Sequence, residues 1–169
     1  LLYSRAFDLL VNLSINSVTK SVSETARMVT EGEIMQLSNQ RQIISKTSYL
    51  EVISRKTAAL FACAGECAAI VTQQAPNNVA AAREFGQQLG ILFQFIDDIL
   101  DYTADADVMG KNIGEDITEG KMTLPLIYAF EKGNPKQQAS IKTAIKEGTY
   151  QLQDILTIIK DNEAIELCQ

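Results

Sequence analysis

The chain has 169 residues, of which 46% are hydrophobic and 21% charged, a composition typical of one globular domain with a proper core. Its formal net charge is −6 and it has no basic run, which argues against a nucleic-acid partner. Three cysteines without a CxxC motif favour free thiols in a reducing, cytoplasmic setting, and no apolar run is long enough to span a membrane.

The first two predicted helices are amphipathic. Apolar residues recur at helical spacing over residues 1 to about 18 and again over residues 19 to about 38. Late in the second helix, Glu33 and Gln36 take positions that apolar residues occupy earlier on the same side. This helix end therefore either lines a polar site or leaves the core. The chain does not begin with Met and helical patterns run through both ends, so we expect a piece of a longer protein.

A third predicted helix, from residue 46 to about 74, carries a lysine on its apolar side. Lys56 falls between Ile53 and Leu60 at helical spacing. Its ammonium group either reaches the edge of the apolar surface through its long side chain or meets an anion. The alanine-rich run 58–69 has small side chains and therefore permits close helix packing.

The fourth predicted helix, from about residue 79 to about 105, is mostly apolar with one narrow polar stripe. Its apolar residues cover a broad side, as in a helix buried within a core. We therefore expect the stripe to face a cavity, and the alternative is an acidic face in water. The polar residues recur every three or four positions: Gln87, Gln94, Asp97, Asp98, Asp101 and Asp105.

The carboxylates of Asp97, Asp98 and Asp101 repel each other, and removing them from water raises their pKa values unless a cation is present. The chain has no His, and hard oxygen ligands on a helix favour Mg²⁺ over zinc. The stripe therefore predicts a magnesium site. Mg²⁺ usually shares its coordination shell with substrate phosphates.

A loop with three glycines follows the acidic helix. Gly110, Gly114 and Gly120 alternate with charged residues, among them Lys111 and Lys121. This pattern fits either a mobile flap whose amides and lysines approach phosphate or an ordinary polar connection.

Three further helices are expected near residues 123–130, 135–147 and 150–168. No stretch shows the alternation typical of a β-strand. The predicted fold class is therefore all-α.

Four motifs stand out when the chain is read as a whole. They are GEIMQL at 32–37, RKTAALF at 55–61, FQFIDDILD at 93–101, and GKNIGED followed by EGKMTLP within 110–125. In this order they closely resemble the trans-polyprenyl diphosphate synthases, and the likeness is strongest toward the bacterial octaprenyl diphosphate synthases. The resemblance covers essentially the whole chain and implies a helical bundle of the isoprenoid synthase type.

The resemblance implies a transferase that condenses an allylic diphosphate with isopentenyl diphosphate into a long-chain product for quinone side chains. In this family the aspartate-rich motif binds Mg²⁺, which places the metal on Asp97, Asp98 and Asp101. Lys56, Lys111 and Asp97 are the expected catalytic residues. Family members are typically homodimers. The residues expected to bind the allylic diphosphate are Lys56, Thr57, Gln94, Lys111 and Lys121.

The family pattern also includes a first aspartate-rich motif and a pocket for isopentenyl diphosphate, and neither is in this chain. We therefore expect residues 1–169 to be a single partial synthase domain, lacking N-terminal and last C-terminal helices and inactive alone. One alternative is a non-catalytic subunit that stabilises or regulates a synthase. Another is an unrelated acidic module for metal storage. The intact aspartates and the three motif lysines disfavour both.

Overall fold

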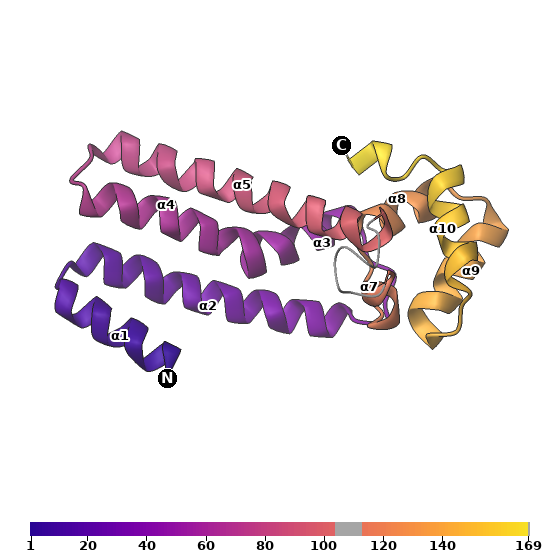
Figure 1. The fold of residues 1–169 in the computed structure, drawn as a ribbon, viewed down its shortest axis with the longest axis horizontal. Helices are drawn as coiled ribbons and strands as arrows, with labels where there is room; N and C mark the ends of the chain where they lie inside the picture. Colours follow the sequence, from indigo (N-terminus) through magenta and orange to yellow (C-terminus); the bar gives the residue numbers. More distant parts are fainter. Residues whose placement is uncertain (104–112, 169) are drawn as a thin grey trace. The chain divides into compact units, whose positions relative to one another are not determined.

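The computed structural model describes residues 1–103 and 113–168, and the regular elements within these ranges are helices (Figure 1). This confirms the all-α prediction. In chain order the elements are α1 (Leu2–Leu13), α2 (Asn16–Asn39), α3 (Lys46–Ile53), the π-helix η1 (Ser54–Ala58), α4 (Ala59–Val71), α5 (Pro76–Thr103), α7 (Glu115–Thr118), α8 (Leu124–Lys132), α9 (Pro135–Glu147), α10 (Leu152–Asp161) and the 3₁₀ turn η2 (Glu166–Cys168).

The chain divides into two compact units. Unit 1 contains Leu1–Glu33 and Ile53–Ile91, and unit 2 contains Ile34–Val52 and the residues from Leu92 onward. Helices α1 and α4 therefore belong to unit 1, and α7 to α10 belong to unit 2. Within the described ranges, no helix combines the length and the apolar character needed to cross a membrane.

The first two helices meet earlier than the sequence pattern suggested. The break lies at Ser14 and Ile15, whereas we expected it near residue 18. Ser14 has a φ of 53°, a left-handed conformation that ends a right-handed helix, and its N–H donates to the carbonyl of Val11. Apolar spacing continues across this break, so periodicity alone did not locate it.

Unit 1 is held together by close approaches between α4 and α5, as the alanine-rich sequence predicted. A Cβ atom on Gly65 would lie 2.4 Å from the carbonyl oxygen of Ala82. A Cβ atom on Gly86 would lie 2.3 Å from the carbonyl oxygen of Phe61. Both distances are below any real contact, so the two backbones meet where glycine leaves room.

A π-helix interrupts the helix that we expected from residue 46 to about 74. Residues Ser54–Ala58 form this turn, which contains Lys56. Gly32 of α2 lies against it, because a Cβ atom there would be 2.6 Å from the backbone nitrogen of Lys56. Single π-turns inside helices are frequent at functional sites. An extra residue in one turn changes apolar spacing too little to be recognised in the sequence.

Unit 2 has its apolar core in α8, α9 and α10. Pro135 begins α9 after a capping box, in which the side chain of Asn134 accepts from the N–H of Gln137 and that of Gln137 accepts from the N–H of Asn134. Gly148, with a φ of 68°, follows the last helical residue, so α9 spans the predicted range 135–147. The fully buried large side chains of this unit are Ile117, Leu124, Pro125, Leu126, Ile127, Ile141, Ile145 and Ile155.

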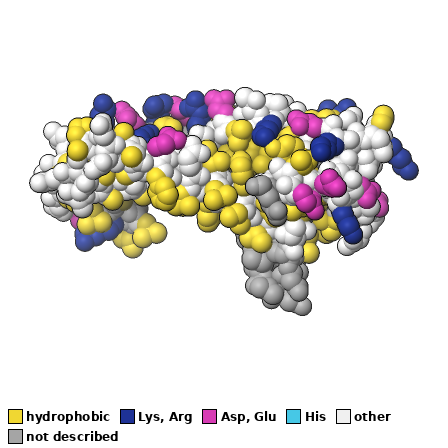
Figure 2. Space-filling view, turned by 90° about the horizontal axis from the view of Figure 1, so that it is seen from above, with side chains coloured by type: hydrophobic (Ala, Val, Ile, Leu, Met, Phe, Trp, Pro, Cys, Tyr) yellow, Lys and Arg dark blue, Asp and Glu magenta, His cyan; other side chains and the backbone are white. Residues whose placement is uncertain are grey.

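The prediction that α5 is a core helix with a buried apolar side is wrong for this chain. Leu92 and Phe93 are 52% and 53% exposed, and Leu89 and Ile96 are exposed as well. Hydrophobic side chains also reach the surface on the face drawn in Figure 2. The buried residues of α5 recur every fourth position or multiple of four: Gly86, Gly90, Asp98 and Tyr102. Periodicity shows which residues share a side of a helix but not which side is covered.

We predict that Gly86→Ala destabilises the chain by about 2 kcal/mol, because the new methyl group must displace the backbone of α4. Helix propensity alone would give the opposite sign, since alanine favours a helix over glycine by about 1 kcal/mol. Urea unfolding followed by circular dichroism measures the change.

The control variant is Ala80→Gly, at an exposed position of α5, which should cost about 1 kcal/mol through propensity. A Gly86→Ala variant that is more stable than the parent chain would contradict the close approach.

Candidate active site

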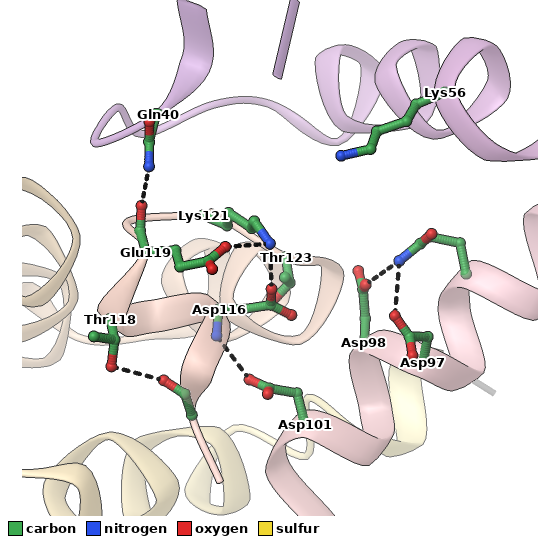
Figure 3. Close-up of polar contacts among 12 residues, drawn as sticks. Gln40, Lys56, Asp97, Asp98, Asp101, Asp116, Thr118, Glu119, Lys121 and Thr123 are labelled. Atoms are coloured by element: carbon green, nitrogen blue, oxygen red, sulfur yellow. Dashed lines mark hydrogen bonds and ion pairs between the residues drawn. The ribbon is translucent and has the colours of Figure 1, made fainter. Parts of the chain in front are cut away.

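The polar stripe of α5 contains one fully buried carboxylate. Asp98 is 3% exposed, although aspartate side chains are rarely buried without partners. Its Oδ1 accepts a hydrogen bond from Nε2 of Gln94, one turn earlier, at 2.8 Å (Figure 3). The same amide nitrogen donates to Oδ2 of Asp97 at 3.3 Å. Gln94 therefore ties two aspartates of the predicted metal site together.

The second partner of Asp98 comes from α3. The hydroxyl of Tyr49 donates to Oδ2 of Asp98 at 2.6 Å, and the Tyr49 side chain is itself buried. The Tyr49 ring also stacks on that of Phe95, with 6.3 Å between ring centroids. Sequence reasoning missed Tyr49. A tyrosine within a short helix carries no signal of the carboxylate that it meets 49 residues later.

Burial sets the protonation of this pair. It raises the pKa of Asp98 to about 6, while the hydrogen bonds from Tyr49 and Gln94 act in the opposite direction. Burial and the adjacent Asp98 charge raise the pKa of Tyr49 well above its usual range. The phenol therefore stays protonated and remains a donor to the carboxylate.

Asp101 joins the stripe to α7. Its Oδ2 accepts from the backbone N–H of Asp116 at 3.3 Å, and its carbonyl accepts from the N–H of Gly114 at 2.9 Å. Burial, and then the negative charge of Asp116, raise the pKa of Asp101 to about 6. Residues 113–123 of the predicted flap thus contain a short helix that is bonded to the end of α5.

Lys121 lies between two carboxylates of this segment. Its Nζ is 3.0 Å from Oδ1 of Asp116 and 2.5 Å from Oε2 of Glu119 (Figure 3). Burial of the ammonium group lowers the pKa of Lys121, but the two carboxylates outweigh it and the pKa lies above its usual value. Asp101, Asp116 and Lys121 therefore form a chain of polar contacts that begins at the stripe.

The remaining predicted residues belong to unit 1 or lie outside the described residues. Lys56 and Thr57 are in the π-turn of unit 1, where Nζ of Lys56 is 2.7 Å from Oε2 of Glu33. The Lys56 ammonium group is partly exposed and meets an anion, the carboxylate of Glu33 on α2. Lys111 lies outside the described residues, as do Asp105 and Gly110.

The donor set of the stripe fits a hard divalent cation, because it consists of carboxylate and amide oxygens. Asp97 is exposed, whereas both oxygens of Asp98 already accept hydrogen bonds. Over residues 1–103 and 113–168, no three His, Cys, Asp or Glu side chains are gathered closely enough to hold a metal by themselves. A cation bound to this stripe would therefore need further ligands, such as water or a phosphate.

Comparisons with known proteins agree with the motifs. The polyprenyl synthetase family model matches residues 1–162. The octaprenyl diphosphate synthase of Escherichia coli strain K12 is 41% identical over 148 residues, which cover 87% of this chain and 46% of the relative. The all-trans-nonaprenyl-diphosphate synthase (geranyl-diphosphate specific) of Rhodobacter capsulatus is 43% identical over 169 residues, 99% of this chain and 52% of the relative.

Solved structures show the same fold. A polyprenyl synthase from Caulobacter crescentus CB15, complexed with calcium and isoprenyl diphosphate, is similar with a TM-score of 0.93 and 33% identity, over 99% of this chain and 52% of that one. The chain spans about half the length of the curated relatives it matches. The helices thus have the isoprenoid synthase arrangement, and the family model covers nearly the whole sequence. This chain belongs to the polyprenyl synthetase family.

Proposed function

We propose that this chain supplies a metal- and diphosphate-binding part of a trans-polyprenyl diphosphate synthase. Such an enzyme condenses an allylic diphosphate with isopentenyl diphosphate. The observation that carries the proposal is the buried Asp98 carboxylate, bonded to Gln94 and Tyr49, on a stripe that continues through Asp101 to Lys121. A surface acidic patch needs no such buried support.

The stripe is the proposed metal site. Asp97, Asp98 and Asp101 would hold Mg²⁺ directly or through water, and the bound ion would neutralise charge on the leaving diphosphate. Gln94 fixes the orientation of Asp97 and Asp98 through the two bonds of its amide nitrogen. A carboxylate whose rotamer is already fixed loses less entropy when it binds a ligand.

Lysines are the proposed ligands of the diphosphate. Negative charge grows on this group as the bond to the allylic carbon breaks, so a fixed cation stabilises the transition state more than the ground state. Lys121 carries such a charge next to the stripe, and the family motifs assign the same role to Lys56 and Lys111, with Thr57 as a hydrogen-bonding partner. If diphosphate replaced Glu33 as the partner of Lys56, the ammonium group would be paired with an anion both before and after the substrate binds.

A long-chain product of the octaprenyl class is the finer proposal. It is supported by 41% identity to the E. coli octaprenyl diphosphate synthase, while a nonaprenyl synthase is 43% identical. Homodimer assembly and a cytoplasmic location stay predictions from the resemblance and the composition.

The second candidate function is a non-catalytic subunit of a prenyl synthase. A subunit that only stabilises a partner has no need for a buried, ionisable Asp98, because such a group opposes folding. The presence of all three aspartates of the stripe, Asp97, Asp98 and Asp101, therefore favours the catalytic proposal.

The pH dependence of the free energy of unfolding tests how much the buried charge of Asp98 destabilises the folded chain. The folded-state pKa of about 6 exceeds the usual unfolded value, so the folded chain binds more protons between about pH 4 and pH 6. This group's contribution to the free energy of unfolding therefore falls as the pH rises through that window, by on the order of 3 kcal/mol. Asp98→Asn removes the charge, so its advantage over the parent chain should grow from pH 4 to pH 6 and then stay constant.

Urea unfolding in buffer without divalent cations, at pH steps from about 4 to about 8, measures this difference. Asp97→Asn is the matched control, because the Asp97 side chain is exposed and its charge remains in water. If the stability difference between Asp98→Asn and the parent chain did not depend on pH, Asp98 would not be a buried carboxylate with a raised pKa.

Activity is tested in a chimera in which this chain replaces the matching half of the E. coli octaprenyl diphosphate synthase. We expect Mg²⁺-dependent elongation of a radiolabelled allylic diphosphate. Asp97→Ala should lower kcat/KM on the order of 10³-fold with the fold intact, while the exposed control Asp161→Ala should leave it unchanged. Near-normal activity of Asp97→Ala would refute the site, and a folded but inactive parent chimera would favour the non-catalytic subunit.

A further inference from the structure

The segment between α2 and α3 is bonded to the turn that precedes Lys121. Nε2 of Gln40 donates to the carbonyl of Glu119 at 2.7 Å (Figure 3). The backbone N–H of Arg41 donates to the carbonyl of Gly120 at 2.8 Å. Two consecutive residues therefore bind two consecutive carbonyls, although about 79 positions separate the partners in sequence.

The backbone is shaped for this contact on both sides. Arg41 has a φ of 60° and Gly120 a φ of 73°, so both are left-handed. A residue other than glycine rarely adopts such a φ unless its surroundings impose it. A Cβ atom on Gly120 would lie 2.6 Å from Cγ of Arg41, and one on Gly148 would lie 3.2 Å from its Nη1. The Arg41 side chain thus fits between two glycines of unit 2.

The contact helps to fix the backbone of Lys121, to which its side chain is attached. The N–H of Gly120 binds the carbonyl of Ile117, and the N–H of Lys121 binds the carbonyl of Asp116, both at 2.8 Å. These bonds hold the turn to α7 only. Gln40 and Arg41 hold its outward carbonyls to a different element, so the turn is anchored on two sides.

We propose that Gln40 and Arg41 are positioning residues that hold the turn 119–121 and thereby place the ammonium group of Lys121 for binding the diphosphate. This inference rests on the proposed function, because it assigns the anchored lysine to that reaction. Neither residue belongs to the motifs of the sequence, and neither contacts the stripe of aspartates directly in any of the bonds described above.

Hydrogen exchange on the chain itself tests the anchor. Gln40→Ala should speed exchange of the Gly120 and Lys121 amides about fivefold to tenfold, with α8 to α10 unaffected. Arg41→Pro removes the backbone N–H and forbids a positive φ, so it should also speed exchange of the Gly120 and Lys121 amides. Arg41→Gly keeps the N–H and allows a positive φ, so exchange should stay as slow as in the parent chain. The matched control is Gln42→Ala, because the Gln42 amide donates within its own neighbourhood, to the carbonyl of Ser38.

A double-mutant cycle in the chimera tests the positioning role. Gln40→Ala should lower kcat/KM for the allylic diphosphate about tenfold in the parent background and have no further effect in a Lys121→Ala background. Additive losses, or amides that exchange as slowly in Gln40→Ala as in the parent, would overturn the proposal. Amide hydrogen exchange tests whether Gln40 and Arg41 hold the turn even if the chimera is inactive. An inactive chimera would count against the proposed function instead.

Discussion

The bond between Tyr49 and the buried carboxylate of Asp98 is the constraint on which the described site depends. A carboxylate taken out of water needs donors, and its two oxygens find them on two different helices. Gln94 extends this arrangement to Asp97 through its second contact. The orientation of the stripe is thus set by neutral donors, which leaves its negative charges uncompensated and suited to a cation.

Acceptors and donors alternate along the path that leaves the stripe. Asp101 meets a backbone N–H of α7, and Asp116 on that helix meets the ammonium group of Lys121. The first contact joins α5 to α7 and the second joins α7 to the turn that follows it, so the acidic helix and the lysine are held as one polar network within unit 2. A partly buried network of this kind strengthens electrostatic interactions with an added cation, because its carboxylates outnumber its ammonium group and little water is present to screen them.

Unit 1 also contains a lysine paired with a carboxylate of the chain, and here the lysine lies in a π-turn. The π-turn η1 brings Lys56 to Glu33, and glycine at position 32 lets α2 approach that turn. The lysine is therefore paired before any substrate is present. An anion that approached Lys56 would have to compete with the Glu33 carboxylate, and a multiply charged anion would do so better than a singly charged one.

The sequence by itself determined the helical class, the family and the identity of the charged residues. The range 135–147 predicted for α9 is the one observed, because its capping chemistry is local. Helical spacing placed Asp97, Asp98 and Asp101 along one stripe for the same reason. The tertiary structure alone decided that α5 buries Asp98 while Leu92 and Phe93 stay exposed, that Tyr49 is the donor, and that Arg41 meets Gly120. These contacts join residues far apart in the chain, and the spacing of side chains along one helix carries no information about the element that packs against it.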